Sequence, residues 1–89
     1  MSTVPAAEPD RPLLELVRDG WRQGLGHEDF RLNDNFFNVG GHSVKALRVM
    51  KSVNAALGTR VPVRLFFENP TVRRLAEAIE RHLSSEVVR

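Results

Sequence analysis

The 89-residue sequence contains no cysteine and no tyrosine, and it has no long apolar run. Without cysteine there can be no disulfide framework, no thiolate zinc site and no cysteine nucleophile. A bilayer-spanning helix needs roughly 18 or more apolar residues in a row. The first ten residues have neither the basic region nor the apolar core of a signal peptide. These absences favour a small cytoplasmic domain that does not enter a membrane.

The net charge is also small, at +2, although the isoelectric point is about 9.9. Residues 1–43 carry seven acids and four arginines, whereas residues 44–89 carry nine bases and four acids. A nucleic-acid-binding protein usually gathers its bases into a patch with interleaved aromatics. Here the bases are spaced along helical patterns, so we interpret them mainly as solvated helix faces. A small helical nucleic-acid-binding domain stays a distant alternative, and a basic surface for an acidic protein partner also stays open.

Apolar residues recur at helical spacing in three stretches, and no stretch alternates convincingly as a strand would. We therefore expect an all-α fold: a small four-helix bundle with three longer helices, one short third helix and a long loop between the first two. The first helix should begin at about Pro12 and end at Gly24 and Gly26. Its inward face is expected to consist of Leu14, Val17, Trp21 and Leu25.

The second helix is expected to cover residues 43–57, with Gly58 following it. Its inward stripe is predicted to be Leu47, Met50, Val53 and Leu57, flanked by Ala46 and Val49. The connection before it, residues 26–42, is long for so small a domain, and such loops are uncommon unless they are functional or packed by their own side chains. We expect it to be pinned to the core through Phe30, Leu32, Phe36, Phe37 and Val39.

The remaining elements are shorter or nearer the C-terminus. Residues 61–63 are expected to be extended, and residues 64–68 to form at most two helical turns. Asn69 as N-cap and Pro70 at the first helical position predict the start of the last helix. That helix should bury Val72, Leu75, Ala76, Ile79 and Leu83. Residues 12–84 are thus the expected domain, with residues 1–11 as a disordered lead and residues 85–89 as a frayed tail.

Ser43 is the most informative residue because it follows a glycine pair at the expected start of the second helix. As an N-cap, it would satisfy backbone donors of that helix. As a nucleophile, it would need a Gly-x-Ser-x-Gly elbow, but Lys45 replaces the second glycine and the chain is too short for the required sheet. As an attachment site, it would be accessible behind glycines that let another protein approach, and the helix dipole would favour a phosphodiester there.

The segment Asp34-Asn-Phe-Phe-Asn-Val-Gly-Gly-His-Ser43 resembles the signature of thiolation domains, the peptidyl carrier proteins of nonribosomal peptide synthesis. The resemblance continues in Val44, in Ala46 and Leu47, and in residues 63–71, and it extends over roughly residues 12–83. It implies a carrier, not an enzyme, whose Ser43 receives the 4′-phosphopantetheine of coenzyme A. The thiol of that arm would carry aminoacyl or peptidyl thioesters, which agrees with the absence of cysteine from the chain.

The resemblance also implies neighbours and partners for Ser43. Gly41 and His42 would adjoin the cofactor, and we expect partner enzymes to contact Phe37, Val44, Lys45, Arg48 and Phe66. The partners would be a phosphopantetheinyl transferase, an adenylation enzyme, and condensation, tailoring or thioesterase enzymes. The carrier is expected to be a monomer that binds neither nucleic acid nor membrane. No metal site is expected, because His27 and His82 lack companions at ligand spacing.

Some positions depart from the commonest family pattern. Asn38 stands where an acid is frequent, Val39 where leucine is, and Lys45 where many relatives are apolar. An acyl or aryl carrier of a polyketide or hybrid pathway is the nearest alternative. His42 and the basic second helix favour the peptidyl class, because fatty-acyl carriers have aspartate before the serine and an acidic second helix. The sequence suits a free-standing carrier and a domain excised from a larger synthetase equally well.

Overall fold

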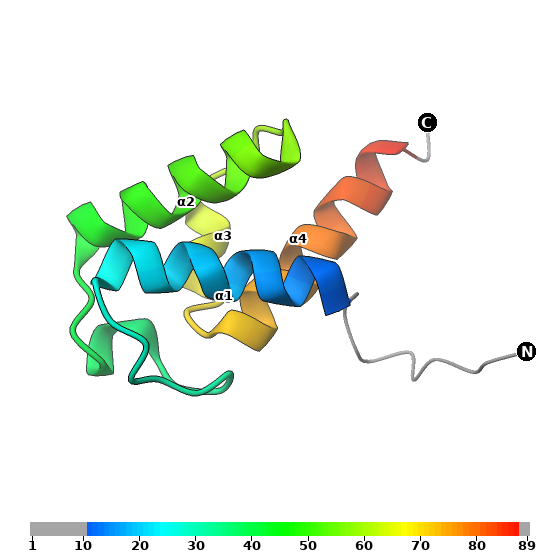
Figure 1. Ribbon diagram of the computed structural model, residues 1–89. Coiled ribbons are helices and arrows are strands. Elements are labelled where there is room, and N and C mark those ends of the chain that lie inside the picture. Colours follow the sequence, from blue (N-terminus) through cyan, green and yellow to red (C-terminus); the bar gives the residue numbers. More distant parts are fainter. Residues whose placement is uncertain (1–10, 88–89) are drawn as a thin grey trace, which may run out of the picture.

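The computed structural model describes residues 11–87, with side chains described as far as Ser84. Four α-helices and one short 3₁₀ helix make up this part of the chain (Figure 1): α1 (Arg11–Leu25), η1 (Phe36–Asn38), α2 (Ser43–Leu57), α3 (Arg64–Glu68) and α4 (Val72–Val87). Residues 11–87 contain no β-strand. The predicted all-α fold with one short third helix is therefore confirmed, and α2 has the predicted bounds.

The outermost helices extend slightly beyond the bounds predicted from the sequence. Arg11, expected in the lead, is the first residue of α1, and Pro12 fits that first turn because its missing N–H is not needed there. Residues 85–87, expected to fray, are helical in their backbone because α4 continues to Val87. The rest of the expected lead and tail lies outside the described residues. No helix of the described part is long and apolar enough to cross a bilayer.

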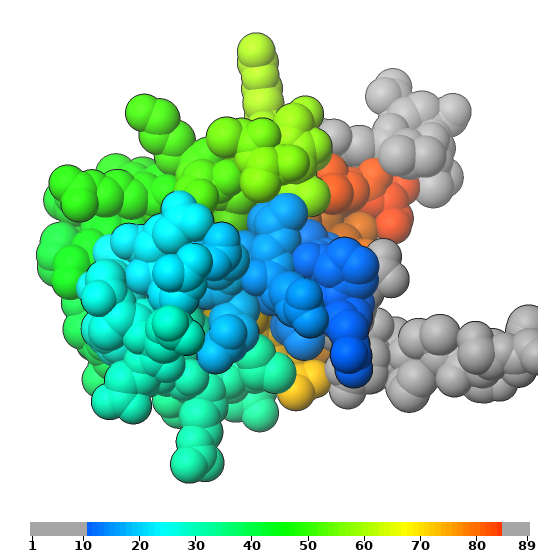
Figure 2. Space-filling view, in the orientation of Figure 1, coloured from blue at the N-terminus to red at the C-terminus, as the bar shows by residue number. Residues whose placement is uncertain are grey.

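Helix α1 packs against both α2 and α4, and α3 packs against α4. Figure 1 shows that α1 and α2 run in opposite directions, so the start of α2 lies at the same end of the molecule as the end of α1. On the face shown in Figure 2, the exposed side of α1 lies between α2 above and the 26–42 connection below. Ser43, as the first residue of α2, is thus presented at one end of the bundle.

Two glycines set the close approach of α1 to α2. Gly24, expected to end the helix, lies inside α1, and Gly26 follows the helix with φ +83°. A Cβ on Gly24 would lie 2.5 Å from Cγ2 of Val49, and one on Gly20 would lie 3.1 Å from Cγ2 of Val53. The prediction that Gly24 ends α1 is therefore wrong, because its missing side chain makes room for α2.

The inward face of α2 also differs from the predicted stripe. Its buried residues are Ala46, Val49, Met50 and Val53. Leu47, predicted to point inward, is 52% exposed, and Leu57 is only partly buried. The close contact with the α1 glycines explains the difference, because it favours the small and β-branched side chains of α2 over a leucine.

Trp21 lies at the centre of the core and is fully buried, as the helical spacing predicted. Its ring centroid lies 5.4 Å from that of Phe30, 4.9 Å from that of Phe36 and 6.0 Å from that of Phe66. Phe30 and Phe36 come from the 26–42 connection, so its predicted attachment to the core is confirmed for these two rings. Phe37 does not share that role, because its side chain is 38% exposed.

The backbone of the connection is also tied to the start of α4. The amide of Phe36 donates to the carbonyl of Pro70 at 2.8 Å, and the amide of Arg73 donates to the carbonyl of Leu32 at 3.0 Å. These bonds satisfy backbone groups that the sequence pattern could not pair. They make the long loop part of the folded unit rather than an appendage to it.

The junction of α3 and α4 corrects another prediction. Asn69, expected to begin the last helix, instead closes α3: its Nδ2 donates to the carbonyl of Leu65 at 3.0 Å. Thr71 caps α4, because its Oγ1 accepts from the amide of Arg74 at 3.0 Å. The predicted buried face of α4 is confirmed except that Leu83 is only partly buried.

Asn54, which the sequence analysis did not single out, fixes the chain that leaves α2. Its Nδ2 donates to the carbonyl of Val61 at 3.0 Å, and its Oδ1 accepts from the amide of Val61 at 2.8 Å and from Oγ1 of Thr59 at 3.0 Å. The αL backbone of Gly58, at φ +68°, turns the chain between these residues. Gly58 thus ends α2 as predicted.

Candidate functional site

Ser43 is the first residue of α2, and its side chain is exposed. His42 holds the N-cap position with an extended backbone, and its side chain makes no capping hydrogen bond. The hydroxyl of Ser43 likewise makes no hydrogen bond to any described residue. The N-cap interpretation of this serine is therefore not realised, and its oxygen is accessible to a modifying enzyme.

The first turn of α2 provides a favourable electrostatic setting for an anion on Ser43. Its first amides have no acceptor within the helix. The helical ladder begins with the amide of Ala46, which donates to the carbonyl of His42 at 2.9 Å. The turn contains no acidic residue. The positive end of the helix dipole and these unpaired amides would stabilise a phosphodiester attached to Ser43.

Polar residues shape the loop that precedes Ser43. The carboxylate of Asp34 accepts from the amide of Arg31 at 2.9 Å, which closes a turn. Oδ1 of Asn35 accepts from the amide of Phe37 at 2.8 Å and so caps η1. These residues belong to the segment on which the family resemblance rests, and their contacts show that they form the loop rather than a catalytic group.

Gly40 and Gly41 must each be glycine, but for different structural reasons. Gly40 has φ +108°, a conformation that side-chain-bearing residues rarely adopt. Gly41 has an ordinary φ, but a Cβ on it would overlap the ring of Phe36 and lie 2.6 Å from the carbonyl oxygen of Phe36. Both glycines were expected to allow the approach of another protein. The structure corrects this, because both are required by the loop itself.

Side chains from elsewhere hold the carbonyls of Val39 and Gly40. Nε2 of His27 lies 2.9 Å from the carbonyl oxygen of Val39, and Nζ of Lys45 donates to the carbonyl of Gly40 at 3.2 Å. Lys45, expected to contact partner enzymes, is half-buried and bonded back to the loop. The chain before Ser43 is therefore held from the side of α1 and from the side of α2.

The residues expected to contact partners divide into exposed and buried ones. Phe37, Val44 and Arg48 are exposed. Phe66 is fully buried in the aromatic core, so its predicted partner contact is wrong. Its neighbour Phe67 is exposed instead and stacks on Phe37, with ring centroids 5.9 Å apart and an interplanar angle of 12°.

Two further large apolar residues, Leu47 and Phe67, are exposed but were not among the expected partner contacts. The exposure of Leu47 was indicated by the sequence, because Leu47 lies three residues after Val44 and therefore on the same side of the helix. For Phe67, the adjacent pair of phenylalanines showed only that one ring should face the core. Which ring does so depends on the packing of Phe66 against Phe36, whose centroids are 4.7 Å apart.

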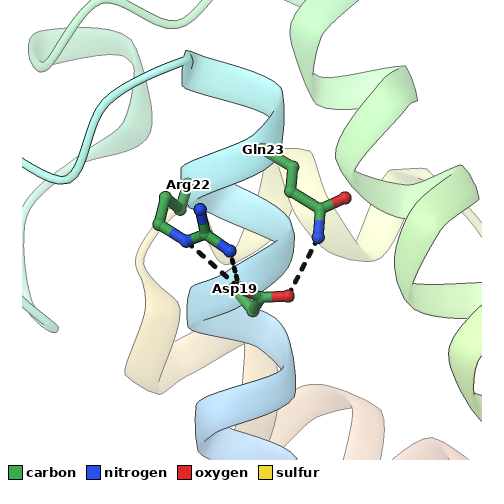
Figure 3. A network of polar contacts seen from close by, with 3 residues as sticks. All are labelled: Asp19, Arg22 and Gln23. Atoms are coloured by element: carbon green, nitrogen blue, oxygen red, sulfur yellow. Dashed lines mark hydrogen bonds and ion pairs between the residues drawn. The ribbon is translucent and has the colours of Figure 1, made fainter.

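Figure 3 shows a polar network on α1 that does not belong to this site. The carboxylate of Asp19 accepts hydrogen bonds from the guanidinium of Arg22 and from Nε2 of Gln23, the latter at 2.9 Å. The Arg22 bond lowers the pKa of Asp19, and the same bond raises the pKa of Arg22. All three residues lie on one helix, so the network braces the surface of α1. No group of three histidine or acidic side chains among the described residues could hold a metal ion.

A small helical bundle that presents one unbonded serine at the start of its second helix has the form of a carrier domain. Comparison with known proteins identifies the family: the model for the phosphopantetheine attachment site matches residues 15–79, and the chain belongs to this family. As a family member, it carries 4′-phosphopantetheine and acts as a carrier rather than a catalyst.

The relatives place the domain in the peptidyl class of carriers. The chain is 40% identical over 74 residues to surfactin synthase subunit 2 of Bacillus subtilis, with 83% of the chain and 2% of the relative covered. It is 41% identical over 76 residues to gramicidin S synthase 2 of Aneurinibacillus migulanus, with 82% of the chain and 2% of the relative covered. The chain thus spans about 2% of the length of these curated relatives.

A solved structure shows the same fold. The chain superposes with a TM-score of 0.73 on a chain in the structure of the phosphopantetheine transferase Sfp in complex with coenzyme A and a peptidyl carrier protein. The two chains are 28% identical, and the match covers 83% of this chain and 96% of the other. The predicted carrier function and fold are confirmed by these comparisons together with the family match.

Proposed function

We propose that Ser43 is the residue that receives 4′-phosphopantetheine, and that the arm carries aminoacyl or peptidyl thioesters in nonribosomal peptide synthesis. One observation carries the assignment. The Ser43 hydroxyl is exposed at the first position of a 15-residue helix and makes no hydrogen bond within the described residues. The family match supports the cofactor, and the synthase relatives support the peptidyl pathway.

The residues around Ser43 fit the group that the family carries. In the transfer, Oγ of Ser43 bonds to the phosphorus that bears the pantetheine, and the phosphoanhydride bond of coenzyme A breaks. Adenosine 3′,5′-bisphosphate leaves, and the hydroxyl proton passes to a base of the transferase. The first-turn amides of α2 would hold the phosphate, and Gly41 and His42 would adjoin it. When bound, the arm supplies the thiol that the cysteine-free chain lacks.

The partner surface is the outer face of α2, which we define as Val44, Leu47, Arg48 and Lys51. These residues follow the i, i+3, i+4, i+7 spacing of one helix face. They are exposed, and Val44 and Leu47 are among the exposed large apolar residues of the domain. The face begins beside Ser43 with apolar residues and continues with two cations. A partner would match it with an apolar pocket followed by acidic groups.

The stacked Phe37 and Phe67 rings form a second exposed apolar site that partners could contact. The proposed partners are the phosphopantetheinyl transferase, the adenylation enzyme, and the condensation, tailoring or thioesterase enzymes. Because one carrier must meet several enzymes in turn, each interface should be small and transient. A monomeric state, a cytoplasmic location and the absence of nucleic-acid or membrane binding stay predictions.

The assignment is tested by incubating the protein with coenzyme A and a promiscuous phosphopantetheinyl transferase, followed by intact-mass measurement. The wild-type protein should gain one phosphopantetheine, and Ser43→Ala should gain none. Ser52→Ala is the matched control, because Ser52 is a half-buried serine further along the same helix, and it should be modified like the wild type. A wild-type protein that stays unmodified with several transferases would contradict the proposal.

A further inference from the structure

His27 joins the two ends of the 26–42 connection. It lies two residues after the end of α1, and its Nε2 lies 2.9 Å from the carbonyl oxygen of Val39, four residues before Ser43. The ring is half-buried and packs edge-on against Phe30, with centroids 6.3 Å apart and an interplanar angle of 67°. Since Phe30 packs against Trp21, the imidazole is supported by the core.

The second ring nitrogen determines where the proton lies. Nδ1 of His27 lies 2.9 Å from the backbone nitrogen of Asp29, which can only donate. Nδ1 must therefore accept and carry no proton, so the proton of the neutral ring is on Nε2. Nε2–H then donates to the carbonyl of Val39. Both ring nitrogens are used, and only one neutral tautomer satisfies both contacts.

Each of the three residues before His42 is held by a hydrogen bond to its backbone. The carbonyl of Val39 accepts from His27, the carbonyl of Gly40 accepts from Lys45, and the amide of Gly41 donates to the carbonyl of Phe36 at 3.0 Å. The imidazole also lies close to Gly40, because a Cβ there would be 3.6 Å from Nε2. The path of the chain into Ser43 is thus set before a partner binds.

We propose that His27 is a positioning residue for the modification of Ser43, acting through its Nε2–H bond to the Val39 carbonyl. The proposal rests on the assignment of Ser43 as the attachment residue. No contact joins His27 to Ser43, so His27 cannot take part in the transfer chemistry. It raises the fraction of molecules whose loop is ready to bind the transferase. Such a fraction scales the apparent affinity and leaves the chemical step unchanged.

Two variants separate the two hydrogen bonds of the imidazole. In His27→Gln, the amide nitrogen lies where Nε2 was and can still donate to Val39, whereas the bond from Asp29 is lost. In His27→Asn, the side-chain oxygen lies where Nδ1 was and can still accept from the amide of Asp29, but nothing reaches Val39. The two variants are matched, because each is a neutral amide that keeps one bond and loses the other.

The kinetic test varies the carrier concentration at saturating coenzyme A. We expect His27→Asn to raise the KM for the carrier about fivefold, which is the size of one lost neutral hydrogen bond. The kcat should be unchanged, and His27→Gln should restore a KM close to that of the wild type. Equal KM values for the wild type and His27→Asn would overturn the proposal. So would equal increases in both variants, because the Val39 bond would then not be the cause.

Two readouts do not depend on transferase activity. Nitrogen-15 resonances of the wild-type ring should show the Nε2–H tautomer, and the amide of Gly41 should exchange with solvent faster in His27→Asn than in His27→Gln. The opposite tautomer, or equal exchange in both variants, would remove the structural basis of the proposal. If these readouts agree with it but the wild-type protein is never modified, the Ser43 assignment fails, and with it the role of His27 in that modification.

Discussion

The two faces of α2 have the same residue spacing and opposite roles. The buried face consists of Ala46, Val49, Met50 and Val53, and the outer face of Val44, Leu47, Arg48 and Lys51. Each follows the i, i+3, i+4, i+7 pattern, and a shift of two residues turns a helix by about 200°. The buried face holds an alanine, two valines and a methionine, whereas the outer face holds an exposed leucine. The glycines of the neighbouring α1 decide which face fits against it.

Helix α2 serves the fold with one face and the function with the other. The buried face fixes α2 against α1, and this fixes the position of Ser43 at its first turn. The outer face is left for contacts with other proteins. Substitutions on the two faces should therefore have separable effects on stability and on modification.

Val49→Asp should have the largest effect. The carboxylate would enter the contact with Gly24, where Val49 is fully buried. Burying an unpaired charge should cost more than about 4 kcal/mol, which is enough to unfold a small domain. Circular dichroism with urea denaturation should show no cooperative transition. The matched control is Leu47→Asp, which should lose less than about 1 kcal/mol because the side chain is exposed. Similar losses in both variants would contradict the division of the helix into two faces.

Gly41→Ala tests whether the tight packing of the buried face extends into the loop that precedes α2. The new methyl group would overlap Phe36, a ring that is fixed in the core, so we expect a loss of about 1–3 kcal/mol. Gly58→Ala is the comparison, because a Cβ there meets no atom within 4 Å and only the positive φ opposes it. That strain should cost about 1–2 kcal/mol. If Gly41→Ala also slows modification, the shape of this loop matters for Ser43; a fully stable Gly41→Ala would show that the loop yields easily.

Leu47→Asp should leave the fold intact and weaken the encounter with partner enzymes. Replacing an apolar contact by a charge at a small interface should lower kcat/KM for modification by at least about tenfold, which corresponds to 1.4 kcal/mol. Steady-state kinetics with the transferase measure this directly. Ala55→Asp, an exposed substitution four residues beyond Lys51 on α2, should have little effect because it lies far from Ser43. Equal losses at both positions would point to a general charge effect instead of a contact.

Asp19→Asn should have the smallest effect and tests whether an outward face can stabilise the fold. The Arg22 hydrogen bond lowers the pKa of Asp19, so its stabilisation is present above the ordinary pKa of about 4 and is lost as the pH falls through the lowered value. Because the group is exposed, the gain is screened and small. Thermal melts of the variant and the wild type should differ slightly at neutral pH in low salt and coincide in acid below the lowered pKa. A difference that persists in acid would require another cause.

The sequence was sufficient for the elements whose signals are local. The span of α2, the turn at Gly58 and the burial of Trp21 follow from helical spacing and from the αL preference of glycine. The decapeptide ending at Ser43 was sufficient to predict the family. These features depend on neighbours within a few residues, or on a pattern that the family shares.

The sequence was insufficient where the outcome depends on a distant contact. Gly24 could be read as a helix end because its partner, Val49, lies 25 positions away and its proximity is a property of the folded bundle. Thr71 rather than Asn69 caps α4, because Asn69 is already bonded to α3. The bond of His27 to Val39 joins residues 12 positions apart, so no local pattern in the sequence indicates it.

The central claim is that the start of α2 presents the modified residue. Its most direct test is site-localising fragmentation mass spectrometry of the wild-type protein after incubation with coenzyme A and a transferase. The account predicts phosphopantetheine on Ser43 and on no other residue. Phosphopantetheine on Ser52, on Ser84 or on any other residue would contradict it.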